Sequence, residues 1–450
     1  MSQAPLLIVI LAAGMGVRMR SGRAKALHGI AGRSLLGHAL AAAKALGAQD
    51  IAVVVAPDMG AVRAEALAQA PGVALFEQAT QSGTADAVLA AAPALERHAG
   101  DVLVLFVDTP LIETSTLKRL LAGLDAANIA VLGFEPDDPS GYGRLLLDAG
   151  GHVAAIREHK DASADERSAR LCNAGAMAFR VPSLTGLIGR VRNDNASREY
   201  YLTDAIALAR GDGRLAVPVV CAPEEALGIN TREQLATAEA IFQRRARAKA
   251  MREGVTMIDP DTVWLSYDTE LGRDVSIEPN VFFGPGVIVE DGAQILANSY
   301  FVGARIGARA RVGPFARLRP GANVGPDVHI GNFVEVKNAS LEAGAKANHL
   351  SYIGDGRVGA GANIGAGTIF CNYDGFNKHF TDVGKGAFIG SNAALVAPVK
   401  IGDGAYVGAG SVIARNVEAE ALAIVRAEHQ VRPGWASKFR ALMQSRKKKA

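Results

Sequence analysis

Cysteine is scarce in this chain of 450 residues, which has only three. Cys172, Cys221 and Cys371 are far apart, and none of them is spaced from another as the ligands of a structural zinc site are. The sequence therefore excludes a disulfide scaffold and favours a reducing compartment, so we expect a cytoplasmic protein.

The chain also lacks a charge excess and long apolar runs. Its 48 Lys and Arg against 45 Asp and Glu give a net charge of +3, which favours neither a nucleic acid nor a membrane surface as partner. The N-terminus has no basic region, and no stretch of about twenty apolar residues occurs, so we expect neither a signal peptide nor a membrane span. The basic run at residues 446–449 is interpreted as a solvated tail.

Glycine is plentiful and concentrated in the second half, where residues 272–434 contain 26 of the 50 glycines. Aliphatic residues recur there every six positions, often followed by Gly. This period fits neither a helix nor a simple strand, and it predicts a hexapeptide β-helix whose aliphatic side chains point inward. The repeating positions are Ile306, Val312, Leu318, Val324, Ile330 and Val336, then Val358, Ile364 and Phe370, then Val383, Ile389, Leu395, Ile401, Val407 and Ile413.

The region 1–230 has a different pattern. Short apolar runs at 6–11, 51–55, 102–107 and 129–132 alternate with helix-like stretches such as 34–46 and 83–91. This alternation predicts a mostly parallel sheet covered by helices, with substrate at the carboxyl ends of the strands. Thr231 and Gln234 resemble a capping box, so we predict three parts: a domain over 1–230, a linking helix over 231–254 and a β-helix domain with a basic tail over 255–450.

Two features of the first domain suggest phosphate chemistry. The segment LAAGMGVR at residues 11–18 follows the first strand, and Arg18 and Lys25 add positive charge nearby. Asp108 ends a later strand, where a carboxylate suits Mg²⁺. Each feature has a plain alternative, namely an ordinary strand–helix turn for the first and a turn Asp before proline for the second.

Together with further segments, these features resemble the sugar-nucleotide pyrophosphorylases. The match narrows to the bacterial bifunctional N-acetylglucosamine-1-phosphate uridylyltransferase/glucosamine-1-phosphate acetyltransferases, and it runs along nearly the whole chain. The segments are Glu77-Gln78, Gly83-Thr84, GYGR at 141–144, EHKD at 158–161, Asn173, EYYLTD at 199–204 and GIN at 228–230. The fold class implied is a Rossmann-like α/β nucleotidyltransferase domain followed by a left-handed parallel β-helix.

The resemblance also implies a role for individual residues of the first domain. Arg18 and Lys25 would neutralise the triphosphate of UTP, and Asp108 and Asn230 would hold Mg²⁺. Uracil and ribose would contact Leu11, Ala12, Gly14, Gln78, Gly83 and Thr84, and the N-acetylglucosamine ring would contact Gly143, Glu158 and Asn173.

Two positions depart from the family. Phe106-Val107 precedes the metal Asp where the family has Tyr-Gly, and Ala24 replaces the usual proline before Lys25. The added bulk at Val107 bears on substrate fit and rate rather than on the class of reaction.

The chemistry of the second half is expected where the repeat breaks, at residues 337–357 and in an insertion at 371–382. His349 lies in the first break, and imidazole suits a general base for acyl transfer to an amine. The alternative is a surface or core histidine. Arg319, Lys337, Tyr352 and Lys378 offer cations and a hydroxyl for a sugar phosphate, although each alone could be a solvated side chain.

The segments GPFARLRP at 313–320, NFVEVK at 332–337, HLSYIG at 349–354, NIGAGT at 363–368 and NYDG at 372–375 again resemble the bifunctional family. By that resemblance, His349 would take a proton from the amine of glucosamine-1-phosphate, which then attacks acetyl-CoA. The sugar phosphate would be held by Arg319, Lys337, Tyr352, Asn363 and Lys378, and the acetyl group and coenzyme A by Ala366, Asn372, Tyr373, Ser391, Ala409 and Arg426. The family forms homotrimers with sites between subunits. Its product, UDP-N-acetylglucosamine, is a precursor of peptidoglycan and lipopolysaccharide. Cys371 is interpreted as a packing residue.

Two other functions stay open from the residues alone. The chain could be a pyrophosphorylase whose β-helix only assembles the protein, or an acetyltransferase whose first domain only binds nucleotide. His349 and the residues that accompany it argue against the first, whereas Arg18, Lys25, Asp108 and Asn230 argue against the second.

Overall fold

The computed structural model describes residues 4–447. The chain divides by its internal contacts into two units, Met1–Ala246 and Arg247–Ala450. The boundary falls inside the long helix α9 (Arg232–Arg252), which occupies the region predicted as a linking helix. The predicted capping box begins it: Gln234 N donates to Thr231 Oγ1 at 3.2 Å, and Thr231 N donates to Gln234 Oε1 at 3.1 Å.

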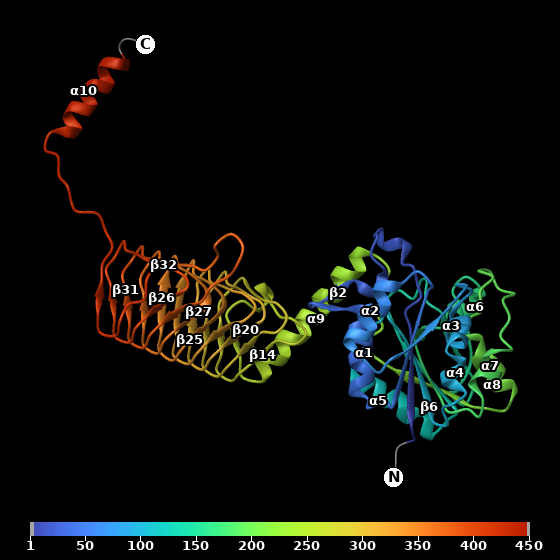
Figure 1. The fold of residues 1–450 in the computed structure, drawn as a ribbon. Coiled ribbons are helices and arrows are strands. Elements are labelled where there is room, and N and C mark those ends of the chain that lie inside the picture. Colours follow the sequence, from blue (N-terminus) through green and yellow to red (C-terminus); the bar gives the residue numbers. More distant parts are fainter. Residues whose placement is uncertain (1–3, 448–450) are drawn as a thin grey trace. The chain divides into compact units, whose positions relative to one another are not determined.

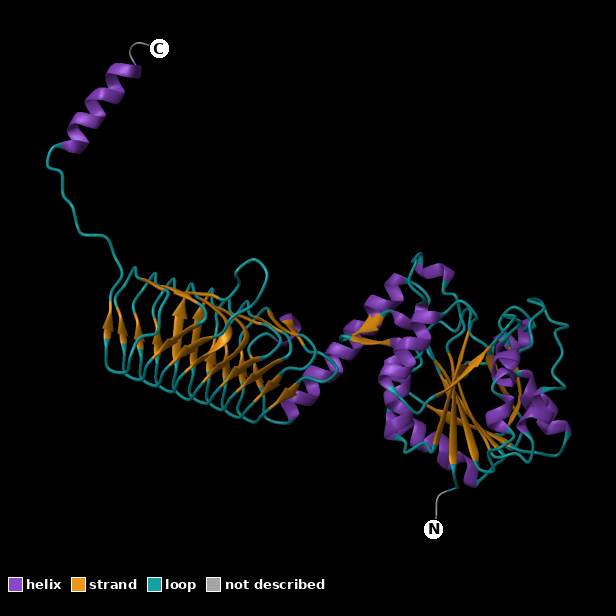
Figure 2. Ribbon diagram, viewed as in Figure 1, coloured by secondary structure: helices purple, strands orange, loops and turns teal. Residues whose placement is uncertain are grey.

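The first unit is built around a nine-stranded sheet with helices packed on both of its faces (Figures 1 and 2). The central order is β11-β7-β10-β6-β1-β4-β5. Its strands are β1 (Leu6–Leu11), β4 (Asp50–Val55), β5 (Ala74–Glu77), β6 (Asp101–Phe106), β7 (Ile129–Phe134), β8 (Arg144–Leu147), β9 (Val153–Arg157), β10 (Cys172–Phe179) and β11 (Ala216–Val220). A separate small ribbon joins β2 (Gly29–Ile30) and β3 (Arg33–Ser34).

The sheet is mostly parallel, as the alternating pattern predicts. β1 pairs in parallel with β4 and β6, while β10 runs antiparallel to β6 and β7, and β8 and β9 form an antiparallel pair. All six residues of β1 are buried, which explains the uninterrupted apolar run. The helices are α1 (Leu35–Ala45), α2 (Gly60–Gln69), α3 (Thr84–Ala90), α4 (Ala92–Leu95), α5 (Thr114–Ala122), α6 (Ala164–Arg167), α7 (Leu184–Ile188) and α8 (Asp204–Gly211). Short 3₁₀ turns cover Val17–Met19, Lys25–Leu27, Gly123–Asp125 and Pro260–Thr262.

The second unit is a parallel β-helix, visible in Figure 2 as a stack of short strands. Every residue of the predicted six-residue repeat is buried, from Ile306 at 0% exposure to Ile413 at 3%, so the prediction of inward-pointing side chains is confirmed. Successive coils pair in register, Arg311 with His329 and then His329 with Lys346, so the length of a coil varies by one residue.

The strands of this unit are two to seven residues long, because the chain must turn a corner after each face. They are β12 (Thr256–Met257), β13 (Val263–Trp264), β14 (Glu270–Leu271), β15 (Ser276–Ile277), β16 (Val281–Phe283), β17 (Ile288–Val289), β18 (Gln294–Ile295), β19 (Tyr300–Phe301), β20 (Ala304–Ile306), β21 (Arg311–Val312), β22 (Arg317–Leu318), β23 (Ala322–Val324), β24 (His329–Asn332), β25 (Glu335–Leu341), β26 (Lys346–His349), β27 (Tyr352–Val358), β28 (Asn363–Ile364), β29 (Ile369–Cys371), β30 (Thr381–Val383), β31 (Phe388–Ile389), β32 (Ala394–Val396), β33 (Val399–Ile401), β34 (Tyr406–Val407), β35 (Val412–Ile413) and β36 (Leu422–Ala423). Helix α10 (Trp435–Lys447) follows, so the predicted tail is helical as far as it is described, and residues 448–450 lie outside the described part.

The two predicted breaks in the repeat have different outcomes. Across residues 337–357 the coil continues, because β25 and β27 stay in register from Glu335↔Tyr352 to Leu341↔Val358. The expectation of an interruption there is wrong: these coils are one residue shorter than the coil that pairs Arg311 with His329, and the difference shifts the six-residue count without breaking the fold. The segment at 371–382 does enlarge its coil, since Asn363 pairs with Phe388, well beyond the length of the other coils.

Two candidate active sites

The first candidate site is a pocket at the carboxyl ends of the parallel strands. β1 ends at Leu11, β5 at Glu77 and β6 at Phe106, and the loops that follow supply polar groups to one cavity. Because β1 pairs with β4 and β6 in parallel, residues distant in sequence meet at this edge. The cavity is lined by Leu11, Ala13, Gly14, Lys25, Gln78, Gln81, Gly83, Thr84, Ala87, Phe106, Val107, Asp108 and Glu199.

Lys25 joins the two residues predicted to hold a metal. Its Nζ lies 2.6 Å from Asp108 Oδ2 and 3.0 Å from Asn230 Oδ1, and the residue is 8% exposed. A backbone bond from Ile229 N to Asp108 O, 2.9 Å long, fixes the two segments side by side. Among residues 4–447, no three His, Cys, Asp or Glu side chains form a metal cluster. One carboxylate and one amide oxygen that converge on a single cation are nevertheless donors of the type that Mg²⁺ takes together with substrate phosphates.

A second wall of this pocket is formed by the loop before α3. Gly83 has φ +130°, and a Cβ there would lie 2.4 Å from the Tyr200 carbonyl oxygen, so only glycine fits. Gln78 is buried, and its Nε2 donates to Gly83 O at 3.0 Å. Thr84 Oγ1 accepts from Leu202 N at 2.9 Å. Gln81, which the sequence analysis did not single out, donates to Ala13 O at 2.8 Å and so ties this loop to the glycine-rich turn.

The three residues predicted to bind the sugar ring also lie together. Asn173 N donates to Gly143 O at 2.8 Å, and a Cβ on Gly143 would meet both carboxylate oxygens of Glu158 at 3.3 Å. Burial raises the pKa of Glu158, while a hydrogen bond from Thr203 Oγ1, 3.3 Å long, opposes that shift. Thr203 is a further residue that the sequence did not reveal, although it belongs to the family-like segment at 199–204.

Not every predicted residue faces the pocket. Arg18 is exposed and does not line it, and among the described residues its side chain forms no hydrogen bond or ion pair. Ala12 is buried beneath the pocket, where its N–H donates to Val54 O at 2.8 Å.

The structure also shows where the residues lie that differ from the family, namely Phe106-Val107 before Asp108 and Ala24 before Lys25. Phe106 lies against Gly175, where an added Cβ would come within 3.2 Å of its ring. Val107 is 4% exposed and lines the cavity, so the departure narrows the pocket beside Asp108. Ala24 has φ −56°, within the range that proline would impose, so the backbone before Lys25 is unchanged by the loss of proline.

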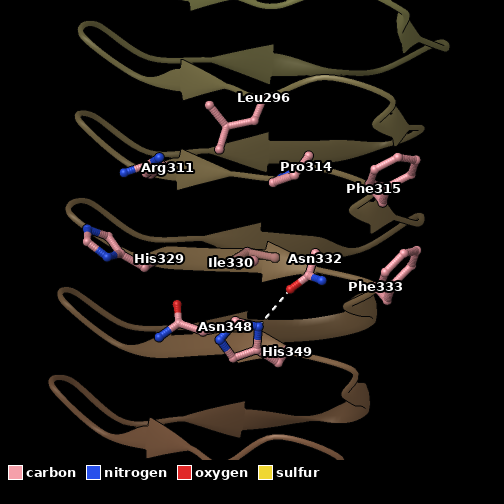
Figure 3. Close-up of a pocket in the computed structure, with 12 residues that line it drawn as sticks. Leu296, Arg311, Pro314, Phe315, His329, Ile330, Asn332, Phe333, Asn348 and His349 are labelled. Atoms are coloured by element: carbon pink, nitrogen blue, oxygen red, sulfur yellow. Dashed lines mark hydrogen bonds between the residues drawn. The ribbon is translucent and has the colours of Figure 1, made fainter.

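The second candidate site lies on the β-helix, around His349 (Figure 3). His349 Nδ1 lies 2.7 Å from Asn332 Oδ1 on the preceding coil, as the dashed line in the figure marks. The cavity is lined by Leu296, Arg311, Gly313, Pro314, Phe315, His329, Ile330, Gly331, Asn332, Phe333, Asn348 and His349. Among the described residues, the lining of this cavity does not include the predicted phosphate-binding residues Arg319, Lys337, Tyr352 and Lys378.

Those cations form a group of their own. Lys378, and to a smaller extent Arg319, lower the pKa of the neighbouring Lys337 ammonium group because their positive charges disfavour its protonated form. Arg319 Nη1 also pairs with Glu335 at 2.8 Å. Like charges held this close are relieved by a bound anion, so the cluster suits a phosphate group.

Beside this cluster, Asn372 links the Tyr352 hydroxyl to the buried carboxylate of Asp355. Asn372 Nδ2 donates to the Tyr352 hydroxyl at 3.5 Å and also to Asp355, which is 9% exposed. Asn338 donates to the other oxygen of Asp355 at 2.6 Å. Neither Asp355 nor Asn332 was found from the sequence. The signal that could have revealed Asn332 is its spacing from His349, which is one coil length.

The residues predicted for coenzyme A lie at one corner of the β-helix. Ala366 O accepts from Asn392 N at 2.7 Å, and Ser391 O accepts from Gly410 N at 2.8 Å, so Ala366, Ser391 and Ala409 lie on successive coils. Arg426 and Tyr373 are exposed, while the side chain of Asn363 forms no hydrogen bond within the described chain. Burial raises the pKa of the Cys371 thiol, which opposes a nucleophilic role.

The fold and the two sites define a two-domain transferase that combines a nucleotidyltransferase unit with a hexapeptide acyltransferase unit. The family model described as a MobA-like NTP transferase domain matches residues 8–174, and the model described as bacterial transferase hexapeptide (six repeats) matches residues 380–415. The β-helix is therefore of the left-handed hexapeptide type. No helix in residues 4–447 has the length and apolar character needed to cross a bilayer.

Curated relatives narrow the class to one family. The chain is 55% identical to the bifunctional protein GlmU of Azorhizobium caulinodans, with 98% of each chain covered. It is 53% identical to the bifunctional protein GlmU of Paramagnetospirillum magneticum over the full length of both, and 54% identical to that of Xanthobacter autotrophicus over 98% of each. The chain belongs to the family of the bifunctional protein GlmU.

Proposed function

We propose that this enzyme makes UDP-N-acetylglucosamine in two steps, acetyl transfer from acetyl-CoA to glucosamine-1-phosphate and then uridylyl transfer from UTP to the product. The observation that carries the proposal is the presence, in one chain of the bifunctional family, of two separate constellations: Lys25 with Asp108 and Asn230, and His349 with Asn332. A scaffold without catalysis has no need of the second, and a pure acetyltransferase has no need of the first.

For uridylyl transfer, positioning and charge neutralisation are the main requirements. Asp108 and Asn230 would hold Mg²⁺, which supplies charge stabilisation at the phosphates when bound. Lys25 neutralises the triphosphate from the same corner of the pocket, and Arg18, which is exposed and outside the pocket lining, would add a second positive charge. The uridine rests against Leu11, Ala12, Gly14, Gln78, Gly83 and Thr84, and Gly143, Glu158 and Asn173 orient the sugar. The sugar phosphate attacks the α-phosphorus, and pyrophosphate leaves.

For acetyl transfer, His349 accepts a proton from the amine of glucosamine-1-phosphate. The bond between nitrogen and the acetyl carbon forms, the carbon–sulfur bond breaks, and coenzyme A leaves as a thiol that takes the proton back from the His349 imidazolium. Arg319, Lys337, Tyr352, Asn363 and Lys378 hold the sugar phosphate. Asn372 and Tyr373 contact the acetyl group, and Ala366, Ser391, Ala409 and Arg426 contact the coenzyme.

We further propose that the enzyme works as a homotrimer. The support is the separation described above: within the described chain, none of the five residues proposed to hold the sugar phosphate lines the cavity around His349, so one chain offers two incomplete halves. A neighbouring copy would bring the halves together. The three cysteines are unpaired, which supports a reducing compartment, and we place the enzyme in the cytoplasm.

The test is a crossed pair of assays on the full chain. Pyrophosphate release from UTP, Mg²⁺ and N-acetylglucosamine-1-phosphate should be lost in Asp108→Ala and kept in His349→Ala. Release of the coenzyme A thiol from acetyl-CoA and glucosamine-1-phosphate should show the opposite pattern. A folded parent chain without pyrophosphate release would reduce the function to acetyl transfer, with Phe106 and Val107 as the first positions to revert to Tyr and Gly.

A further inference from the structure

The contact between Asn332 and His349 joins two coils at the centre of the second site. The two residues are direct partners in the parallel pairing of β24 and β26. A backbone bond from Leu350 N to Asn332 O, 3.0 Å long, fixes the height of one coil on the other. At Gly331 the coils approach so closely that a Cβ would lie 1.9 Å from the Asn348 carbonyl oxygen. The position of Asn332 relative to the imidazole is thus set by the backbone.

The chemistry of the contact determines which ring nitrogen carries the hydrogen. The atom of Asn332 that faces the ring is the amide oxygen, 2.7 Å from His349 Nδ1, and an amide oxygen can only accept. Nδ1 must therefore be the donor, and in the neutral ring Nε2 then has the free lone pair. Among the described residues, no other hydrogen bond or ion pair reaches this ring. The charged or titratable side chains that share its cavity are Arg311 and His329.

We infer that Asn332 is a positioning residue for acetyl transfer, which holds His349 in the tautomer whose Nε2 can accept the proton of the substrate amine. The inference rests on the proposed acetyl transfer and assigns a residue that acts through the base rather than on the substrate. Without the acceptor on Asn332, the neutral ring would distribute its hydrogen between both nitrogens and would rotate about its side-chain bonds. Asn332 would thus orient the base without taking its proton, which is the role of the aspartate in a Ser–His–Asp catalytic triad.

The experiment compares Asn332→Leu, which removes the acceptor at similar size, with Asn332→Asp, which keeps an acceptor and adds a charge. The steady-state kcat and KM of acetyl transfer are measured over pH in the full-length protein. Asn332→Leu should lower kcat about tenfold to a hundredfold, while KM for both substrates stays within about twofold. Asn332→Asp should recover most of kcat and move the acid limb of the profile to higher pH, because a carboxylate beside the ring favours its protonated form.

Asn323→Leu is the matched control. Asn323 is an exposed residue of β23 in the same β-helix, and it does not line the cavity around His349. Its kcat should stay within about twofold of the parent, since it has no role in the tautomer. In a double-mutant cycle, Asn332→Leu should have no further effect once His349 is Ala, because a positioning residue acts only through the group it positions.

The outcomes separate this inference from the function on which it rests. Acetyl transfer that depends on His349, together with equal kcat values for Asn332→Leu and Asn323→Leu, overturns the inference and leaves the function standing. An Asn332→Asp profile without a displaced acid limb, or a loss in Asn332→Leu that is matched by a lowered melting temperature and not rescued by Asp, indicates a packing role and also overturns it. A folded parent chain without acetyl transfer overturns both.

Discussion

The two units build their sites by opposite means. In the α/β unit, Lys25 meets Asn230 from a distant part of the sequence, and a buried sheet brings the segments together. In the β-helix, Asn332 meets His349 on the next coil, and the length of that coil brings them together. The geometry of the first site therefore depends on packing between elements that are distant in sequence, whereas the geometry of the second depends on the number of residues in one coil. Changes of charge should disturb the first most, and changes of backbone spacing the second.

The largest effect is expected when a positive charge is removed from the first site. Lys25→Met should lower the rate of uridylyl transfer about a hundredfold or more, because it removes the charge proposed to neutralise the triphosphate and takes away the ion-pair partner of Asp108. Acetyl transfer should be unchanged. Pyrophosphate release at saturating substrates measures the effect. Lys44→Met is the control, since Lys44 is exposed and its Nζ donates a hydrogen bond to the Gln69 carbonyl oxygen. A parallel loss of both activities would mean that the two units are not independent.

Backbone spacing in the second site should give the next effect. Gly331→Ala places a methyl group on the Asn348 carbonyl oxygen and should lower the free energy of unfolding by about 1–3 kcal/mol, with loss of acetyl transfer and retention of uridylyl transfer. Gly14→Ala is the counterpart in the first unit, where no atom lies within 4 Å of the new methyl group. Its unfolding should match the parent, while its KM for UTP should rise. Denaturant unfolding and both assays would show whether the contrast holds.

The cation cluster predicts a pH effect of intermediate size. Because Lys378 and Arg319 lower the pKa of Lys337, that ammonium loses its proton at lower pH than an ordinary lysine does. Attraction for the sugar phosphate should therefore weaken as pH rises through the lowered pKa, and KM for glucosamine-1-phosphate should increase. Lys378→Met removes the main cause and should move this rise to higher pH. KM measured from neutral to alkaline pH tests it, and identical profiles for parent and variant would contradict it.

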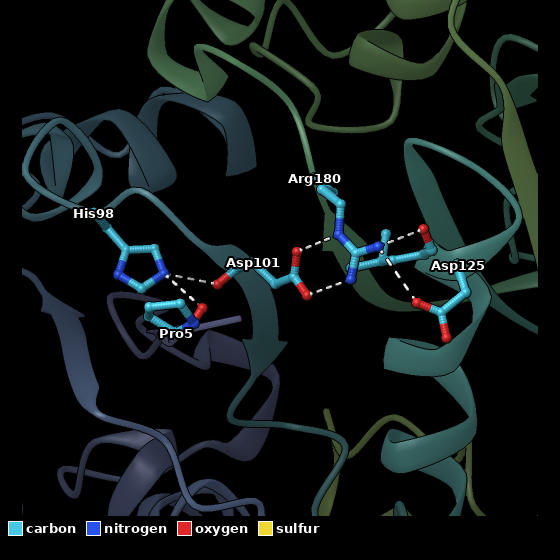
Figure 4. A network of polar contacts seen from close by, with 6 residues as sticks. Pro5, His98, Asp101, Asp125 and Arg180 are labelled. Carbon is cyan, nitrogen blue, oxygen red and sulfur yellow. Dashed lines mark hydrogen bonds and ion pairs between the residues drawn. The ribbon is translucent and has the colours of Figure 1, made fainter. Parts of the chain in front are cut away.

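The smallest expected effect concerns the stability of the first unit, away from its site. Arg180 bridges Asp101 at 2.7 and 2.9 Å and Asp125 at 3.3 Å (Figure 4). Asp101 has an 11% exposed side chain and Asp125 a 79% exposed one. Asp101→Asn should lower the free energy of unfolding by about 1–3 kcal/mol, but Asp125→Asn by about 0.5 kcal/mol or less. Thermal unfolding of both variants measures the two losses of stability. Equal losses would contradict the prediction that the buried ion pair with Asp101 contributes more than the exposed pair with Asp125.

Much of the fold could be predicted from the sequence because its signals are periodic. The six-residue repeat follows from inward-pointing side chains such as Ile330 and Leu395, which are buried throughout. The buried strands of the first unit are apolar along their whole length, as in β1. The coil length was not predictable, since a coil that is one residue shorter shifts the repeat in the way an interruption would. For this reason the region after Val336 was wrongly expected to break.

The sites were less predictable, because their partners are set by three-dimensional proximity. Asp108 and Lys25 each carry a weak signal alone, and only the fold places them 2.6 Å apart. Thr203 and Asp355 have no signal of their own, since each acts on another polar group within the protein. Arg18 shows the reverse case: it belongs to the glycine-rich segment that suggested phosphate binding, but it does not line the pocket.

The length of each coil decides which side chains of the β-helix meet. Coils that differ by one residue coexist in this fold, but Asn332 and His349 are direct partners one coil apart, so deleting a residue between them would shift Asn332 out of register with the imidazole. The segment at 371–382 escapes this limit, because it leaves the coil and returns with Phe388 still opposite Asn363. The pairing of the coils should therefore survive insertions and deletions within this segment, whereas acetyl transfer should depend on its length, because Asn372, Tyr373 and Lys378 lie in it.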